Sequence, residues 1–411
     1  MKNRSLYQQK GMVLVVGVLL IVALLVLGTI AMITTTTELR MTGFFKSGKK
    51  VFYIAEAGIE DAKARLRAGA ENAIVDGHPT QSGWEAYIGT VTKSQGKGYN
   101  SGNTMHVRVD RLQSDLDYVV TIVHQTDGAG NILYWGDANG DGITERTTAS
   151  GGSLRNIYKV TSEGSYAGAS RTLVVELARM PPINVPGALY VNATTTVQGS
   201  STNIIGTDGC GGSDLAGIVT TQGTGSVTLN GGPDITGVGG TTPNIAYGGT
   251  GMNVQSMIDR FKGSANFKYT VNAATLTATS VPGPGDGWGI PTPGATSQLP
   301  SSCSAHNIVY YNTAGTDIQL SGGATGCGLF LVEGDLILHG NFSWYGVVIA
   351  TGSIIFTGGG DKNITGAMLA GGSADADLVG GNANIVYCSS AVQNQTENQH
   401  TQVLSWKDKA N

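Results

Sequence analysis

The sequence has few charged residues and no concentrated positive charge. Of its 411 residues only 13% are Asp, Glu, Lys or Arg, and the formal net charge is −4. A protein that binds nucleic acid neutralises phosphates with a cluster of Lys and Arg. This chain lacks such a cluster, so we expect no nucleic acid among its partners. Its length nevertheless allows two or three domains with cores of their own.

Short motifs of the common enzyme classes are also missing. The six histidines are scattered without an HExxH zinc motif, and no glycine-rich Walker loop is present. Two carboxylate pairs, Glu333 with Asp335 and Asp375 with Asp377, have the composition that a glycosidase requires. Alternating acids in glycine-rich segments are more typical of solvated turns. We therefore expect a protein that is not an enzyme.

What the sequence does contain is one long hydrophobic segment near its amino terminus. Residues 12–33 include Thr29 as the only clearly polar side chain. A helix of this length, roughly 33 Å, crosses the hydrocarbon core of a membrane. A cleavable secretory signal has a shorter apolar run and a small-residue cleavage site behind it, whereas four threonines follow here. We expect residues 12–33 to be a transmembrane helix.

The helical pattern continues beyond the apolar segment. Apolar residues return at steps of four and three, with charged residues on the other faces, which is typical of an amphipathic helix. This stripe consists of Met41, Phe45, Gly48, Phe52, Ala55, Ile59, Ala62 and Leu66. The sequence thus predicts one helix over residues 12–69, about 85 Å long, whose stripe docks a globular domain.

The segment TTTTELRMTGFFKSGKKVFYIAEAGIEDAKARL, together with the basic leader before the apolar run, resembles the amino-terminal region of PilX-type minor pilins. The resemblance covers about residues 8–68. It implies that residues 1–11 are a leader, which a prepilin peptidase removes by cutting between Gly11 and Met12 on the cytoplasmic face. The helix would remain as a membrane anchor and later join other major and minor pilins in a filament.

One position departs from the pattern of most pilins, because Val16 stands where they carry Glu as the fifth residue of the mature chain. This departure disfavours the bulk subunit. The resemblance therefore implies a minor pilin at or near the tip of a type IV pilus, which promotes assembly or displays an adhesin. The expected location is the inner membrane, with a single pass and a periplasmic carboxy-terminal part, and then the cell-surface pilus. The alternatives are a tip pseudopilin of a type II secretion system and a membrane-tethered β-solenoid that binds or degrades carbohydrate.

The middle of the chain carries strand patterns. Alternating or β-branched runs bounded by turns occur at residues 105–112, 117–124, 131–135, 156–163 and 171–178. A long helix with an antiparallel sheet of four or five strands predicts a pilin-like α+β domain over residues 70–179. A proline-rich linker follows at residues 180–187.

A possible cation site lies between two of these strands. Asp137, Asn139 and Asp141 alternate with glycines, and Ile143 and Glu145 follow at the same spacing. Oxygen ligands at alternate positions with glycine turns are typical of a Ca²⁺ loop, in which Ile143 would contribute its carbonyl. Position twelve is Thr148 instead of the usual Glu, and an ordinary turn is the alternative interpretation. We expect a calcium site here.

Glycine dominates the second half. Gly334, Gly340, Gly346, Gly352 and Gly358 are six residues apart, with short apolar strands between them. This spacing favours an all-β, glycine-rich β-solenoid over residues 188–390, with an antiparallel sandwich as the alternative. One helix is expected within residues 252–262. Residues 391–411 are polar and are expected to form a loose tail.

All four cysteines lie in this half: Cys210, Cys303, Cys327 and Cys388. None belongs to a CxxC motif, which disfavours a metal cluster. An even number in the part expected outside the membrane suggests two disulfide bonds. Three pairings are possible, and we favour Cys303 with Cys327 and Cys210 with Cys388.

Overall fold

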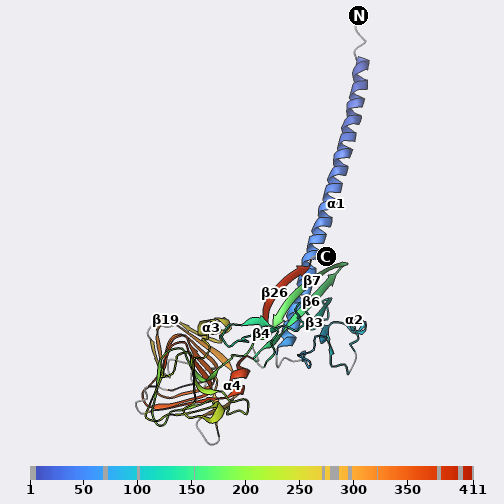
Figure 1. Ribbon diagram of the computed structural model, residues 1–411. Coiled ribbons are helices and arrows are strands. Elements are labelled where there is room, and N and C mark those ends of the chain that lie inside the picture. The colour runs from blue at the N-terminus through green and yellow to red at the C-terminus, as the bar shows by residue number, and fades with distance from the viewer. Residues whose placement is uncertain are drawn as a thin grey trace.

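The computed structural model describes residues 6–67, 73–99, 102–151, 153–270, 274–277, 287–294, 299–321, 323–376, 381–396 and 401–409. Its longest element is α1 (Leu6–Leu66), a helix of 61 residues that projects from two β-rich domains (Figure 1). The amino terminus lies at the end of this helix that is far from both domains. The long apolar helix that the sequence predicts is therefore present, and it ends at Leu66.

The first domain, called the proximal domain below, consists of the second half of α1 and an eight-stranded sheet. Its strands are β1 (Glu85–Ile88), β2 (His106–Val109), β3 (Tyr118–His124), β4 (Tyr134–Gly136), β5 (Glu145–Thr147), β6 (Arg155–Tyr166), β7 (Ala169–Ala178) and β26 (Gln402–Lys409). A short helix, α2 (Val91–Gln95), connects β1 to β2. All pairs are antiparallel except β1 with β2. The sheet is thus larger than the predicted four or five antiparallel strands.

The second half of α1 packs on β3, β6 and β7 through the apolar stripe. Ile59 and Ala62 are fully buried, whereas Met41 and Phe45 at the start of the stripe are 58% and 74% exposed. The prediction that the whole stripe docks the domain is therefore wrong for its first two members. Gly164 in β6 allows the close approach, because a Cβ there would lie 2.5 Å from a backbone oxygen of α1.

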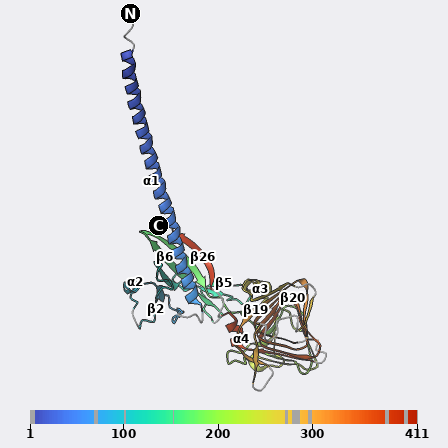
Figure 2. The same cartoon turned by 180° about the vertical axis from the view of Figure 1, so that it is seen from behind.

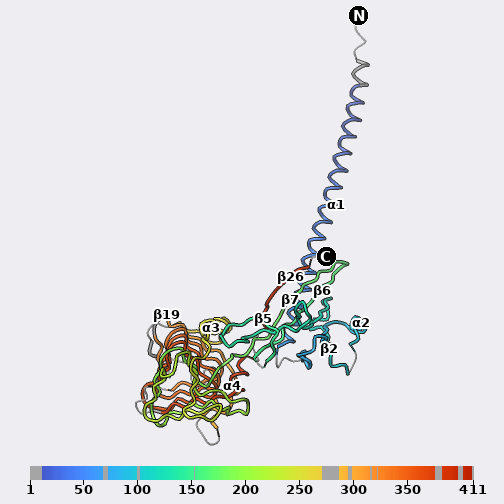
Figure 3. The backbone as a smooth tube through the Cα atoms, in the orientation of Figure 1, coloured from blue at the N-terminus to red at the C-terminus, as the bar shows by residue number. Residues whose placement is uncertain are grey.

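The second domain, called the distal domain below, spans residues 187–396 and contains a sheet of sixteen strands. They are β8 (Gly187–Val191), β9 (Thr195–Gln198), β10 (Asn203–Ile205), β11 (Ala216–Thr220), β12 (Val227–Asn230), β13 (Asp234–Thr236), β14 (Ile245–Tyr247), β15 (Phe267–Thr270), β16 (Ala274–Thr277), β19 (Asn307–Ser321), β20 (Ala324–His339), β21 (Phe342–Ala350), β22 (Ile354–Thr357), β23 (Gly360–Ala370), β24 (Ala374–Ala376) and β25 (Gly381–Tyr387). Its pairings are all parallel, unlike those of the antiparallel sandwich considered as the alternative. Figure 3 shows the chain winding repeatedly through this domain.

Glycine positions explain the winding. Gly328 pairs with Gly346, which pairs with Gly366, so the three glycines stack in neighbouring strands. Their φ angles of 116°, 139° and 138° are accessible to glycine and strained for other residues. A Cβ at Gly346 would lie 2.1 Å from the carbonyl oxygen of Gly328. The six-residue spacing read from the sequence is one third of the 18-residue offset between β20 and β21.

Smaller elements complete the distal domain. A two-stranded antiparallel hairpin, β17 (Pro291–Pro293) with β18 (Pro300–Cys303), lies against β20 and β21. Helix α3 (Val254–Lys262) occurs where the sequence predicts it, and it buries one apolar face that consists of Val254, Met257, Ile258 and Phe261. The remaining elements are α4 (Ser389–Gln393) and the 3₁₀ turns η1 (Val238–Gly240) and η2 (Asn394–Thr396).

The carboxy-terminal segment is not a loose tail, contrary to the prediction. Strand β26 returns to the proximal sheet and pairs with β7 in antiparallel fashion, so the carboxy terminus lies beside α1 (Figures 1 and 2). The distal domain is therefore an insertion between two neighbouring strands of the proximal sheet. Strands β8 and β25, which come from the two ends of the insertion, both pair with β23. The two ends of the insertion therefore lie next to each other in the distal sheet.

Disulfide bonds and apolar contacts stabilise the distal domain and its connection to the proximal domain. The disulfide bonds join Cys210 with Cys388 and Cys303 with Cys327, which is the pairing favoured from the sequence. The segment predicted as a linker is packed as well, since Ile183 and Val185 are 3% and 6% exposed within the distal core. Residues 180–187 thus form a packed connection between the domains.

Candidate functional site

The first half of α1 presents an extended run of exposed apolar side chains. Every residue from Met12 to Lys46 is exposed. In the described part of the chain this is the one helix that is long and apolar enough to cross a membrane. An uncovered apolar surface of this extent marks a membrane or protein contact.

The threonines after the apolar segment are compatible with the same surroundings. The hydroxyls of Thr34, Thr35, Thr36 and Thr37 each donate to the backbone carbonyl four residues earlier, at 2.7–2.9 Å. A side chain whose donor is satisfied within its own helix can enter an apolar environment at much lower cost. The apolar contact surface therefore extends past Ile33.

Aromatic side chains continue this surface to the edge of the proximal sheet. Phe44 and Phe45 are 77% and 74% exposed. With Met41 and Arg171 they line an open cleft of about 460 Å³ between α1 and β7. The apolar face of the helix and this cleft form one continuous candidate interface, called the helix interface below.

The expected cleavage site lies inside α1, and the structure shows Gly11 and Met12 as part of the continuous helix. Val16, which replaces the usual Glu, is 56% exposed on the helix. The cut between Gly11 and Met12 stays a prediction.

The predicted calcium loop forms a tight turn between β4 and β5. The Asp137 carboxylate is 3% exposed and accepts the backbone N–H groups of Gly140 at 2.7 Å and Gly142 at 2.9 Å. Asp141 accepts the backbone N–H of Ile143 at 2.8 Å. Both glycines have positive φ, 79° and 83°, which other residues rarely adopt. Glycine and aspartate thus fix this turn by local geometry.

The three carboxylates among the predicted ligands, those of Asp137, Asp141 and Glu145, do not all lie within 4.8 Å of one another. Glu145 is exposed at the start of β5, and Ile143 is 46% exposed. In the parts of the chain that the structure describes, three His, Cys, Asp or Glu ligand atoms come within 4.8 Å of one another only at Asp208, Cys210 and Cys388. Those two cysteines form a disulfide bond, so that set is not a metal site.

The loop instead contacts the distal domain. The Asp141 carbonyl accepts the backbone N–H of Asn253, the residue that caps α3, at 2.6 Å. Burial lowers the pKa of Arg260 on α3 to about 10, while the charge of Asp137 raises it. Residues 137–145 therefore join the two domains, a role that the sequence pattern did not suggest.

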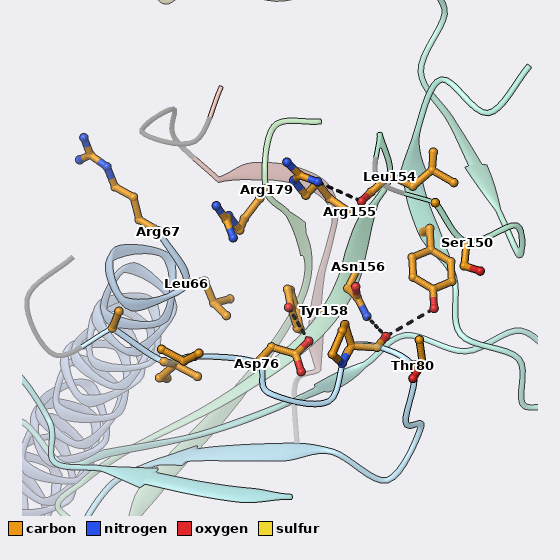
Figure 4. Close-up of a pocket in the computed structure, with 16 residues that line it drawn as sticks. Leu66, Arg67, Asp76, Thr80, Ser150, Leu154, Arg155, Asn156, Tyr158 and Arg179 are labelled. Carbon is orange, nitrogen blue, oxygen red and sulfur yellow. Dashed lines mark hydrogen bonds between the residues drawn. The ribbon is translucent and has the colours of Figure 1, made fainter. Parts of the chain in front are cut away.

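A second cavity, of about 530 Å³, lies below the end of α1 (Figure 4). Asp76 in its wall accepts hydrogen bonds from Tyr158 at 2.9 Å and pairs with His124 at 2.8 Å. Burial by itself would raise the pKa of Asp76, but these hydrogen bonds outweigh it and hold that pKa below its usual value. Arg155 and Arg179 stand above Asp76 in Figure 4. The carboxylate is already fully engaged in fixing the segment after α1 to the sheet, which suits a structural role.

The carboxylates considered for glycoside hydrolysis are engaged as well. Glu333 binds the ammonium of Lys262 and the amide of Gln255, both at 2.8 Å, and accepts the hydroxyl of Tyr310 at 2.6 Å. Asp335 accepts a backbone N–H at 2.6 Å. The Asp375 side chain and Asp377 lie outside what the structure describes. Glu333 thus stabilises the packing of α3, whereas Asp335 fixes the turn at Ser353 before β22.

Known proteins resemble this chain in two comparisons. Residues 10–60 match the family model described as PilX N-terminal, so the amino-terminal region is type IV pilin-like. A crystal structure of the competence-associated pilin ComZ from Thermus thermophilus matches 88% of this chain and 97% of that chain, with 11% sequence identity and a TM-score of 0.20. No protein of curated function matches the chain.

Proposed function

We propose that the chain is a minor pilin, processed by a prepilin peptidase between Gly11 and Met12 and then incorporated into a type IV pilus. The observation that carries this proposal is the helix interface, which is exposed from Met12 to Lys46 and lies in the segment that matches the PilX N-terminal model. In the inner membrane lipid covers this surface. In a filament the helices of neighbouring pilins replace the lipid without exposing apolar area to water.

The shape supports the proposal of a position at or near the tip. The distal domain stands to one side of the α1 axis in both views (Figures 1 and 2). A domain of this size beside each helix would collide with neighbouring subunits along a fibre, whereas the end of a fibre leaves room for it. There it promotes assembly or carries an adhesin, and the parallel, repeatedly stacked strands support a rigid β-solenoid as the displayed part. This role requires no catalytic activity.

The mature amino terminus tests the proposal. We expect protein from sheared surface fibres to begin at Met12 by mass spectrometry, and Gly11→Val to retain residues 1–11. Gly17→Val is the matched control, because nothing lies within 4 Å of a Cβ placed there. Fibre-associated protein that still begins at Met1 would rule out processing. Loss of pili on deletion, without loss of secreted enzymes, separates a pilus from a secretion pseudopilus.

We also propose that the loop of Asp137, Asn139 and Asp141 binds Ca²⁺ weakly, with the Ile143 carbonyl and Glu145 completing the site. Support comes from the three side-chain oxygens on one turn held by two left-handed glycines. Glu145 would have to move inward, and the nearby Arg260 charge opposes the ion, so binding in the millimolar range is expected. Calcium titration of the wild type and of Asp141→Ala tests this, with heat of binding in the wild type alone as the expected result.

A further inference from the structure

A cavity of about 490 Å³ lies on the outer face of the distal sheet, between that sheet and the β17–β18 hairpin. Its floor is formed by Thr325 in β20, Ser343 in β21 and Asn363 in β23. These three residues pair with one another in register, so their side chains form a column with one member per strand. Adjacent strands are about 4.8 Å apart, which sets the spacing of the column.

The floor presents polar atoms that the protein itself does not use. The Thr325 hydroxyl is buried and has no hydrogen-bond partner in the described parts of the chain. No hydrogen bond is formed by the Ser343 side chain within those same residues. Asn363, 7% exposed, accepts at its oxygen from Asn384, which leaves its amide N–H group available. A buried polar group without a partner costs about 1–3 kcal/mol, so this column is prepared for a ligand with hydroxyl groups.

The opposite wall is apolar. It consists of Pro291 and Pro293 in β17 and of Ile290, which is 59% exposed. Proline rings pack well against C–H groups and cannot donate backbone hydrogen bonds. A ligand that fits between these walls has one face of C–H groups and an edge of hydroxyl or amide groups.

Charge and strand pairing restrict the ligand further. Among the residues that the structure describes, Asp361 is the one charged residue that lines the cavity. The neighbouring Lys362 is buried, with its ammonium bound to three backbone carbonyls. An anionic ligand would be repelled. Strands β20, β21 and β23 each have partners on both sides, so the floor of the cavity offers an extended peptide no open strand edge.

We propose that this cavity binds a neutral oligosaccharide, built of hexose or N-acetylhexosamine units. Sugar hydroxyls bond to Thr325, Ser343 and Asn363, and the C–H face of a ring lies on the proline wall. This inference goes beyond incorporation into a pilus and does not depend on it, because binding is a property of the distal domain.

Calorimetric titration of the full chain in detergent with chitohexaose, cellohexaose and hexagalacturonate tests the proposal. We expect at least one neutral hexamer to bind and hexagalacturonate to bind far more weakly. The double variant Thr325→Val with Ser343→Ala should lose about tenfold in affinity, since two hydrogen bonds are removed without a change of shape. Thr228→Val, at an exposed position on β12 outside the cavity, is the matched control. Asp361→Asn should reduce the difference in affinity between the neutral hexamers and hexagalacturonate.

Three results would overturn the proposal. These are no binding of either neutral hexamer to folded protein, equal affinity of the double variant and the wild type, and binding of hexagalacturonate as tight as that of the neutral hexamers. If the protein bound no sugar, and if it self-associated in a way that Ser343→Arg abolished, the cavity would instead be a contact site for a second copy of the chain.

Discussion

The buried ion pair of Asp61 and Arg65 allows a sharp test of how α1 is fixed to the proximal sheet. The two side chains are 2% and 5% exposed and lie 2.6 Å apart one helical turn from each other. Asp61 also accepts the hydroxyl of Tyr118 at 2.7 Å and the backbone N–H of Leu112 at 3.0 Å. Burial, and then the hydrogen bond to Asp61, raise the pKa of Tyr118 to about 12, so this hydroxyl remains a donor at neutral pH. Asp61→Ala removes the acceptor common to all three donors.

Removing one partner of a buried ion pair costs about 3–5 kcal/mol, because the other charge loses its counter-ion in a buried environment. Each 1.4 kcal/mol corresponds to a tenfold change in an equilibrium constant. We therefore expect amide-hydrogen protection in α1 from Val51 to Leu66, and in β3, to fall by roughly 10²–10⁴-fold in Asp61→Ala. Hydrogen exchange read by mass spectrometry resolves these segments, and the distal domain serves as an internal reference.

Glu60→Ala is the matched control, since it removes the neighbouring carboxylate of the same helix. Glu60 pairs with Lys63 at 2.8 Å, but Glu60 is 59% exposed. An exposed pair contributes about 0–1 kcal/mol. If Asp61→Ala lowered protection no more than Glu60→Ala, the claim that the buried pair anchors the helix would be refuted.

Three further changes test the remaining parts of the fold. Gly346→Val should destroy the protease resistance of the distal domain, because the φ angle of Gly346 is 139° and a Cβ there would lie 2.1 Å from a backbone oxygen. Gly223→Ala is the control and should leave this resistance intact, because nothing lies within 4 Å of a Cβ at Gly223. Replacing both Cys210 and Cys388 by Ser removes a link between residues 178 apart and should lower the free energy of unfolding in urea by about 2–4 kcal/mol. The pKa of Asp76 is lowered in the folded state, so the contribution of its carboxylate to the free energy of unfolding is fully present above the ordinary pKa of 3.8 and is lost as pH falls through the lower folded-state pKa. In Asp76→Asn the free energy of unfolding should therefore fall less steeply with decreasing pH. Equal acid profiles of the variant and the wild type would contradict this.

Local patterns in the sequence determined two helices, one turn and the positions of several glycines in this protein. An unbroken apolar run with a following stripe specifies α1, because helical periodicity depends on neighbours three and four residues apart. The buried residues of α3 were predictable for the same reason. The turn at Asp137 and the six-residue glycine spacing are likewise local, since each depends on the backbone freedom of glycine. These features required no knowledge of distant contacts.

Only the tertiary structure decided how the carboxy-terminal segment joins the proximal sheet. Arg171 and Asp408 form an ion pair between β7 and β26 although they are 237 residues apart. The sequence of β26, QVLSWKDK, lacks the apolar alternation that marks a strand, because most of its side chains are exposed and need not be apolar. Asp61 likewise lies on the charged side of the helical pattern and becomes buried only because β3 supplies Tyr118. Pairing between distant segments depends on edge hydrogen bonds and on partners that no short window contains. The cavity floor of Thr325, Ser343 and Asn363 arises in the same way, from register between strands and not from sequence spacing.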